Sequence, residues 1–322
     1  MHTTFELFRA FVPVGAGCLL AVTSAQVFAQ AAADAPNETV GDEIIVRGRR
    51  MSEIDSNLRI EIDKFVTQVA APAPERGYAR WHRDVCVSVQ NLERTAAQYL
   101  VDRISRLAAD VGLMPGEPGC NPAVVIAFST DGKQTARQLI AERPGVLRPT
   151  AEGGMQRGLE AMQAFAESDK AVRWWHVSVP VDARFGNPAV RMPGEELSPG
   201  LDRLHWVTVE GPSRIHSGLR DDLAYAIIIV DSQKLQGKGT TWEQLGDYLA
   251  FLALAQVDLS ADPSAFDSIL NLFSNPKAYS GLTDWDRSYI RALYRFDQER
   301  DPRMQRNGLV DAMAHGAGDA GD

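Results

Sequence analysis

The chain has 322 residues, of which 45% are hydrophobic and 23% are charged, and its formal net charge at pH 7 is −9. This composition is typical of a globular protein with its own core and argues against a disordered chain. The negative charge, without a dense Lys/Arg tract, excludes nucleic acid and anionic membrane surfaces as expected partners, because both are bound mainly through cationic side chains.

The N-terminus has the three-part pattern of a secretory signal. A polar start ends at Arg9, a run of small and apolar residues covers 11–22, and Val27-Phe28-Ala29 has small or compact residues where a signal peptidase cleaves. The apolar run is about half the ~20 residues that a membrane-spanning helix needs. We therefore expect residues 1–29 to be a signal peptide (cleavage after Ala31 is the alternative), the mature protein to be periplasmic or secreted, and no integral membrane segment to remain.

Cysteine usage agrees with export. There are three cysteines, and Cys18 lies within the expected signal. Lipidation of Cys18 is the less favoured alternative, because Gly15-Ala16-Gly17 lacks the usual apolar residue upstream of a lipoprotein cysteine. Cys86 and Cys120 remain in an oxidising compartment, where an even pair usually forms a disulfide; two buried thiols are the alternative.

Residues 30–50 are expected to form a disordered leader, because their first part is rich in Ala, Asp, Pro and Asn and has no apolar period. The leader ends in a β-prone segment that begins Glu43-Ile44-Ile45-Val46. This segment resembles the TonB box of outer-membrane receptors. The resemblance implies a TonB-like envelope partner that binds the segment by strand addition. A simple tail or an edge strand is the alternative.

A helix is expected over 52–70, where Pro72 and Pro74 end it. Residues 51–80 are therefore interpreted as a helical lead-in, and 81–315 as a single α+β domain. Its mixed β-sheet is expected to begin with a βαβ unit: a strand over 85–89, a helix whose apolar stripe runs from Ala96 to Val111, and a strand over 122–128. Gly112 stands where a helix C-cap glycine belongs.

The βαβ interpretation makes the disulfide testable. Strands of such a unit run parallel, so Cys86, at the start of the first strand, and Cys120, just before the second, lie at the same edge of the sheet. A bridge is feasible if the strands are neighbours and the Cα atoms lie within about 7 Å. It would close a loop of about 34 residues and stabilise the fold by roughly 3–4 kcal/mol.

The rest of the chain predicts further strands and then a helical final third. Helices are expected over 132–142 and 155–166, strands over 172–179, 204–209 and 225–230, and a turn-rich loop or hairpin over 183–199. Thr240 and Thr241, with Glu243 and Gln244 three residues on, have capping-box spacing before the wholly apolar run 248–255. Later helices are expected over 262–273, from Thr283 to about Phe296 and over 304–313, with a disordered tail at 316–322.

Few residues suggest chemistry. No cofactor is expected. His176 and His205 lie in strands and could approach one another as metal ligands, although half-buried strand residues are the favoured interpretation. No Gly-x-Ser-x-Gly elbow or P-loop spacing is present. Trp174 and Trp175 point to opposite faces of a strand; we favour both filling gaps between sheet and helices over one forming an exposed ligand platform.

The carboxylates Asp231, Glu243 and Asp247 flank the strongest strand and the apolar helix. Paired carboxylates perform acid–base catalysis when burial separates their pKa values. The structural alternative is favoured: Asp231 ends a strand, Glu243 belongs to the capping box, and Asp247 lies on the exposed side of the helix.

The order of elements resembles the zincin metalloprotease fold, in which edge strands lead into a helix carrying His-Glu-x-x-His. The corresponding residues here are 227–231 followed by 241–250, and that helix contains no histidine. The resemblance therefore implies a degenerate relative without zinc. The chain also resembles uncharacterised exported bacterial proteins, in which Arg80-Trp81, Cys86, Cys120 and Leu282–Asp286 recur; this likeness implies no particular activity.

Two functional hypotheses follow. The first is an exported, non-catalytic binding or envelope-associated protein on a degenerate metalloprotease-like scaffold, because a well-formed core pattern occurs without a ligand or nucleophile constellation. The alternative is a hydrolase that acts on an envelope polymer through Asp231, Glu243 and Asp247.

Overall fold

The computed structural model describes residues 56–70, 72, 76–147, 158–187, 189–190, 207–208 and 217–318. All of them belong to one compact unit, residues 48–322. The expected signal, the TonB-box-like segment and His205 lie outside the described residues. Among the helices that are described, none is both long and apolar enough to cross a bilayer.

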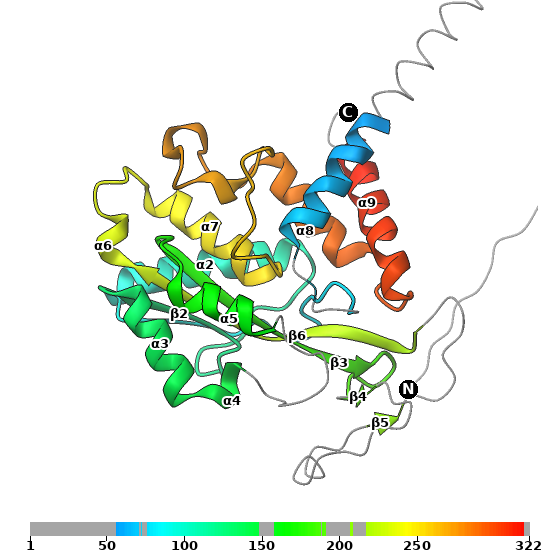
Figure 1. Ribbon diagram of the computed structural model, residues 1–322, viewed down its shortest axis with the longest axis horizontal. Coiled ribbons are helices and arrows are strands. Elements are labelled where there is room, and N and C mark those ends of the chain that lie inside the picture. The colour runs from blue at the N-terminus through cyan, green and yellow to red at the C-terminus, as the bar shows by residue number, and fades with distance from the viewer. Residues whose placement is uncertain are drawn as a thin grey trace, which may run out of the picture. The chain divides into compact units, whose positions relative to one another are not determined.

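A mixed four-stranded sheet forms the centre of the fold, which confirms the α+β class (Figure 1). Its spatial order is β1-β2-β6-β3, with β1, β2 and β6 parallel and β3 antiparallel to β6. A separate parallel pair joins β4 to β5. The bounds are β1 Val87–Gln90, β2 Val124–Ser129, β3 Val172–Asp182, β4 Ala189–Val190, β5 Val207–Thr208 and β6 Leu219–Asp231.

Helices cover both faces of this sheet (Figure 1). One face carries α2 (Arg94–Asp110) and α7 (Trp242–Leu254), and the other carries α3 (Gly132–Glu142), α4 (Pro144–Leu147) and α5 (Gly158–Glu167). Neighbouring tryptophans of β3 show the two sides: the Trp174 ring lies 6.4 Å from Tyr248 of α7, and the Trp175 ring 6.0 Å from Phe165 of α5. Both are almost fully buried, which confirms that they fill gaps between sheet and helices.

Helix α7 is the centre of the core. Its residues from Gln244 to Leu254 are all buried, and the burial of 248–254 agrees with the apolar run predicted from the sequence. Thr241 and Gln244 form the capping box at its start. Helices α8 (Asp284–Arg295) and α9 (Pro302–Gly318) follow, with α6 (Ser232–Leu235) before α7.

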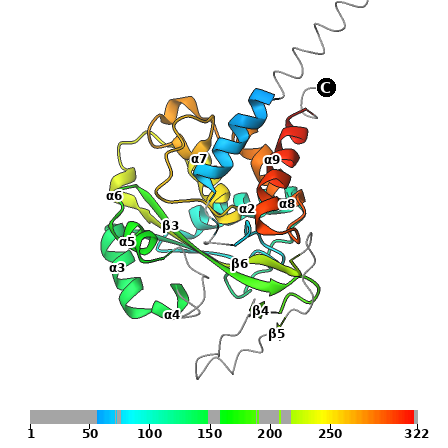
Figure 2. The same ribbon diagram turned by 45° about the vertical axis from the view of Figure 1, so that its right-hand side comes forward.

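The helix over residues 56–69 belongs to the same core rather than to a separate lead-in. It lies beside α8 and α9 in both views of the ribbon (Figure 2). Its Phe65 is fully buried and makes edge-to-face contacts with Phe266, Trp285 and Tyr289, at ring-centroid distances of 5.1, 5.5 and 5.1 Å. These aromatic contacts fix the helix to the final third of the chain.

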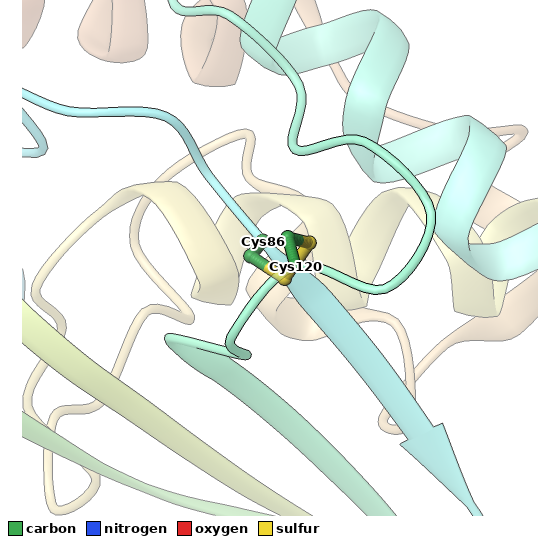
Figure 3. Close-up of a disulfide and its surroundings, with 2 residues drawn as sticks. All are labelled: Cys86 and Cys120. Atoms are coloured by element: carbon green, nitrogen blue, oxygen red, sulfur yellow. A yellow bond between two sulfur atoms is a disulfide. The ribbon is translucent and has the colours of Figure 1, made fainter.

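The disulfide joins the strand starts as expected (Figure 3). Cys86 and Cys120 are bonded, and their Cα atoms lie 6.0 Å apart. Val87 of β1 pairs with Val124 of β2 in a parallel register, so the βαβ unit is also confirmed. The backbone N–H of Val124 donates to the carbonyl of Cys86 at 2.9 Å, which holds the two starts together independently of the sulfurs.

The expected helix over 262–273 is wrong. This stretch consists of turns with one short 3₁₀ helix, η2 (Ile269–Asn271), followed by η3 (Pro276–Ala278). Polar side chains divert the backbone: the Asn271 amide donates to the carbonyls of Pro263 and Phe266 at 3.0 and 2.9 Å, and Ser268 caps η2. Such local side-chain bonds compete with helix formation.

Two elements of the structure are longer than the sequence predicted. Strand β6 begins at Leu219 rather than 225, and α9 continues to Gly318, beyond the expected end of the domain at 315. The first half of β6 contains Arg220-Asp221-Asp222, whose charges hide its strand character. The structure pairs these charges, because Arg220 Nε donates to Asp222 Oδ1 at 2.9 Å, so the polar half can pair with β3.

Candidate functional site

A cavity of about 630 Å³ lies at the carboxyl end of β6, larger than the other cavities described below. It is bounded by the start of β3, by α6 and the turn after it, by α7, and by the loop 257–274. Large concave sites of this kind are where small ligands usually bind. We call it the lysine cavity; its charged and aromatic lining residues are Lys170, Lys234, Lys238, Asp169, Asp258, Asp262, Trp174, Tyr248 and Phe273.

The aromatic part of the lysine cavity is rigid. Tyr248 packs edge-on against Phe273, with 4.8 Å between ring centroids, and against Trp174. The indole N–H of Trp174 donates to the carbonyl of Val257 at 2.9 Å, which ties β3 to the start of the loop. Burial raises the pKa of Tyr248, so its phenol stays neutral at any physiological pH. These rings provide an uncharged wall for an apolar group.

Lys170 closes one side of the lysine cavity. Its Nζ donates to the carbonyls of Leu259 and Ala261 at 2.6 and 3.4 Å and lies 5.7 Å from the centre of the Trp174 ring. Burial lowers the pKa of Lys170, and the nearby carboxylates Asp258 and Asp262 partly oppose that effect. This lysine is therefore largely engaged in holding the loop against β3.

The other two lysines differ in how they are paired. Lys234 Nζ donates to the backbone carbonyl of Asp169 at 3.0 Å and lies 3.4 Å from its carboxylate, which Lys133 also contacts at 2.8 Å. These hydrogen bonds, first that from Lys133, lower the pKa of Asp169. Lys238 is exposed, lines the cavity, and has no ion-pair partner within the described part of the chain. It is the cation most available to a ligand.

The three carboxylates named as catalytic candidates are held in structural contacts. Asp231 accepts from the backbone N–H groups of Gly132 and Lys234, both at 3.1 Å, and so caps α6 and contacts the start of α3. Glu243 and Asp247 are brought together by Arg103 of α2, at 3.2 and 2.5 Å. None of the three lines the lysine cavity.

Asp247 is buried, not on the exposed side of α7 as its position suggested. Besides Arg103 it accepts from the backbone N–H of Leu282 at 2.9 Å, and so connects α2, α7 and the segment before α8. A Cβ on Gly281 would lie 2.3 Å from its Oδ2, so only glycine allows this close approach. The hydrogen bond to Asp247 is the main cause that raises the pKa of Arg103, which stays charged.

Replacing Asp247 with asparagine should reveal this structural role. We expect a loss of about 2 kcal/mol in the free energy of unfolding, because the partly buried Arg103 loses its charged partner. The matched control Glu243→Gln should cost less than about 1 kcal/mol, because that side chain is 61% exposed. Urea denaturation would measure both, and equal effects would contradict the assignment.

The histidine hypothesis is only partly testable. His176 is buried in β3 with Nε2 2.7 Å from the carbonyl of Leu252, which agrees with the favoured interpretation of a strand residue bonded to backbone. His205 lies outside the described residues. Within the residues that are described, no group of three or more His, Cys, Asp or Glu side chains is placed to hold a metal ion.

Sequence reasoning missed the lysine cavity, because its lysines come from two separated segments and isolated lysines usually indicate only a solvated surface. The available signal was the cluster of Lys234 and Lys238 directly after the strongest strand, where ligand groups of α/β sheets tend to lie. No protein-family model, curated protein or solved structure matches this chain, so the roles of its residues rest on their geometry.

Proposed function

We propose that this protein is an exported binding protein that holds a small amphipathic anion in the lysine cavity without transforming it. The observation that carries the proposal is the pairing of a rigid aromatic wall with the available ammonium group of Lys238 in one concave site. An aromatic or aliphatic body would pack on Phe273, the half-buried ring of this wall, which Tyr248 and Trp174 support from behind. A carboxylate on that body would bind Lys238, with Lys234 beside it.

Export is the second part of the proposal. The signal-like start of the chain and the disulfide between Cys86 and Cys120 support a periplasmic or secreted location, because such bonds persist mainly outside the reducing cytosol. We further propose that the TonB-box-like segment Glu43-Ile44-Ile45-Val46 engages a TonB-like envelope partner by strand addition.

The proposed scaffold is a metalloprotease-like one without its metal. In support, β6 leads through α6 into the buried helix α7, beside the antiparallel strand β3 at the end of the four-stranded sheet. Helix α7 contains no histidine, and its carboxylates Glu243 and Asp247 are bound to Arg103. The hydrolase alternative gains no support from these contacts, because Asp231 shares none of them.

Phenylacetate is a suitable probe, with the neutral phenylacetamide as its matched control. Isothermal titration of the mature chain should show that phenylacetate binds at least fivefold more tightly than the amide, because only the acid can pair with an ammonium group. Lys238→Gln should reduce phenylacetate affinity about five- to tenfold. Lys277→Gln, an exposed lysine outside the cavity lining, should leave it unchanged.

Three outcomes would contradict the proposal. The first is equal affinity for acid and amide, and the second is no binding of phenylacetate at all. The third is hydrolysis of an isolated envelope polymer by the wild-type chain that is lost in Asp231→Asn, Glu243→Gln or Asp247→Asn, which would establish the carboxylate mechanism instead.

A further inference from the structure

The sheet has a point where successive connections leave on opposite faces. After β1 the chain enters α2, which packs with α7 on one face, and after β2 it enters α3, which packs with α5 on the other (Figure 1). The carboxyl ends of β1 and β2 therefore flank a topological switch point. In open α/β sheets, ligands bind in the crevice outside the carboxyl ends of the strands at such a point.

Two cavities, of about 410 and 390 Å³, open there and adjoin. Both are lined by Leu92, Phe128 and Ser232, so they form one continuous site, which we call the switch crevice. It reaches from Asn91, directly after β1, to Trp242 in the first turn of α7. The site shares no lining residue with the lysine cavity.

The lining of the switch crevice is uncharged but rich in hydrogen-bonding groups. No Asp, Glu, Lys or Arg is among the described residues that line it, whereas three lysines and three aspartates line the lysine cavity. This lining favours a neutral ligand that carries several hydroxyl groups. The polar lining residues are Asn91, Ser129, Thr130, Thr135, Ser232, Gln236, Thr240 and Thr241.

An aromatic platform stands at one end. The Trp242 side chain is exposed, with a relative accessibility of 49% for the residue, and its ring lies 6.5 Å from that of Phe128. Trp242 is the one tryptophan among the large exposed hydrophobic residues of the described chain, since Trp81, Trp174 and Trp175 are buried. An exposed indole face beside hydroxyl groups can stack on the apolar C–H face of a sugar ring, while the edge of the indole remains in contact with water.

Some polar side chains of the lining are held by hydrogen bonds within the protein, and others make none. The hydroxyls of Ser129 and Thr135 are bonded to each other at 2.7 Å, which orients both. The hydroxyl of Thr240 is buried without any hydrogen-bond partner. The side chains of Thr130 and Gln236 likewise make no hydrogen bond to other described residues. The side chains of Thr130 and Gln236 are therefore available to a ligand or to the waters around it.

Asn91 supports the same location. It is the one non-glycine among the described residues with a positive φ, of 60°. Its side-chain amide donates to the carbonyl of Phe128 at 3.1 Å and so ties the end of β1 to the end of β2. Unusual backbone conformations concentrate at ligand sites, where surrounding contacts hold them in place. The tie fixes the width of the crevice between the two strands.

We propose that the switch crevice binds an uncharged saccharide, with one sugar ring stacked on Trp242 and hydroxyl groups directed toward Thr130 and Gln236. The site lies beyond the proposed function, because it uses other residues and a different ligand chemistry from the lysine cavity. An anionic sugar would find no cation in the lining, so neutral sugars should bind best.

The test uses the mature chain with maltose, cellobiose and N,N′-diacetylchitobiose, and with digalacturonate as the anionic comparison. Saturation-transfer NMR should show contact through ring C–H protons for at least one neutral disaccharide, and titration should give at least fivefold weaker binding of digalacturonate. Trp242→Ala should weaken the neutral disaccharide at least tenfold, and Trp242→Phe should restore part of the affinity. Phe185→Ala, which truncates an exposed aromatic residue outside the crevice, should have no effect.

Several results would overturn the saccharide site. They are no binding of any of the three neutral disaccharides, unchanged affinity in a Trp242→Ala variant that melts like wild type, or tighter binding of digalacturonate. Binding of a neutral apolar tripeptide such as Leu-Gly-Leu, competed by none of the sugars, would assign the crevice to peptides instead. Lys238→Gln should leave saccharide affinity unchanged. The experiment can therefore distinguish a failure of the saccharide proposal from a failure of the lysine-cavity proposal.

Discussion

Removal of the disulfide, by Cys86→Ala together with Cys120→Ala, is expected to lower the free energy of unfolding by about 3–4 kcal/mol. The bond closes a loop with a sequence separation of 34 residues, and its loss frees the unfolded chain to occupy more conformations. The native sheet should survive, because the backbone bonds between the starts of β1 and β2 remain. Guanidinium denaturation would measure the change.

Reduction of the wild-type chain provides the control for the disulfide prediction. A thiol reductant should lower wild-type stability by about the same amount as the double substitution and leave the double variant unaffected. An unchanged denaturation midpoint of the wild-type chain in the presence of the reductant would contradict the prediction. So would a mass spectrum that shows two free thiols in the protein isolated from its natural compartment. The same mass measurement locates the mature N-terminus and so tests export.

Asp286→Ala is expected to destabilise the fold by about 3–4 kcal/mol, because it leaves several buried donors unpaired at once. The Asp286 carboxylate is fully buried and accepts from the Ser268 hydroxyl at 2.6 Å and the Ile269 N–H at 2.8 Å. It also accepts from the Thr283 N–H at 3.0 Å, which completes the capping box of α8. One side chain therefore holds the start of α8 and the turn at η2 together.

Asp284→Ala is the matched control for Asp286→Ala. Asp284 lies in the same first turn of α8 but is exposed, so its loss should change stability by no more than about 0.5 kcal/mol. Thermal and urea denaturation of both variants would decide the comparison. Similar effects of the two substitutions would contradict the claim that the buried hydrogen bonds, rather than the charge near the helix N-terminus, give Asp286 its importance.

The Asp286 contacts also give a physical meaning to the segment Leu282–Asp286. Thr283 and Asp286 cap the helix, while the N–H of Leu282 donates to Asp247 of α7. The segment therefore connects three parts of the core.

Local signals were enough to predict much of the framework. The limits of α3 and the parallel pair β1 and β2 followed from apolar period and end signals, and the disulfide followed from their topology. Where charged or amide side chains decide the path of the backbone, the sequence pattern predicted the wrong element. The charged start of β6 concealed a strand, and Asn271 turned an apparently helical stretch into a loop.

The candidate sites could not be predicted because each is assembled from distant segments. The lysine cavity combines a residue before β3 with others after β6 and a loop beyond α7, and none of these segments alone has a recognisable motif. The switch crevice depends on Trp242, for which no role was predicted from the sequence. Its exposure arises from its place in the first turn of α7, where the side chain lies outside the core.

The position of the sulfur bridge has one more consequence. It fastens the amino ends of β1 and β2, whereas Asn91 and the switch crevice lie at their carboxyl ends. A change in redox conditions therefore acts at the opposite end of these strands from both candidate sites. Formation of the bond should therefore stabilise the fold without changing the lining of either cavity.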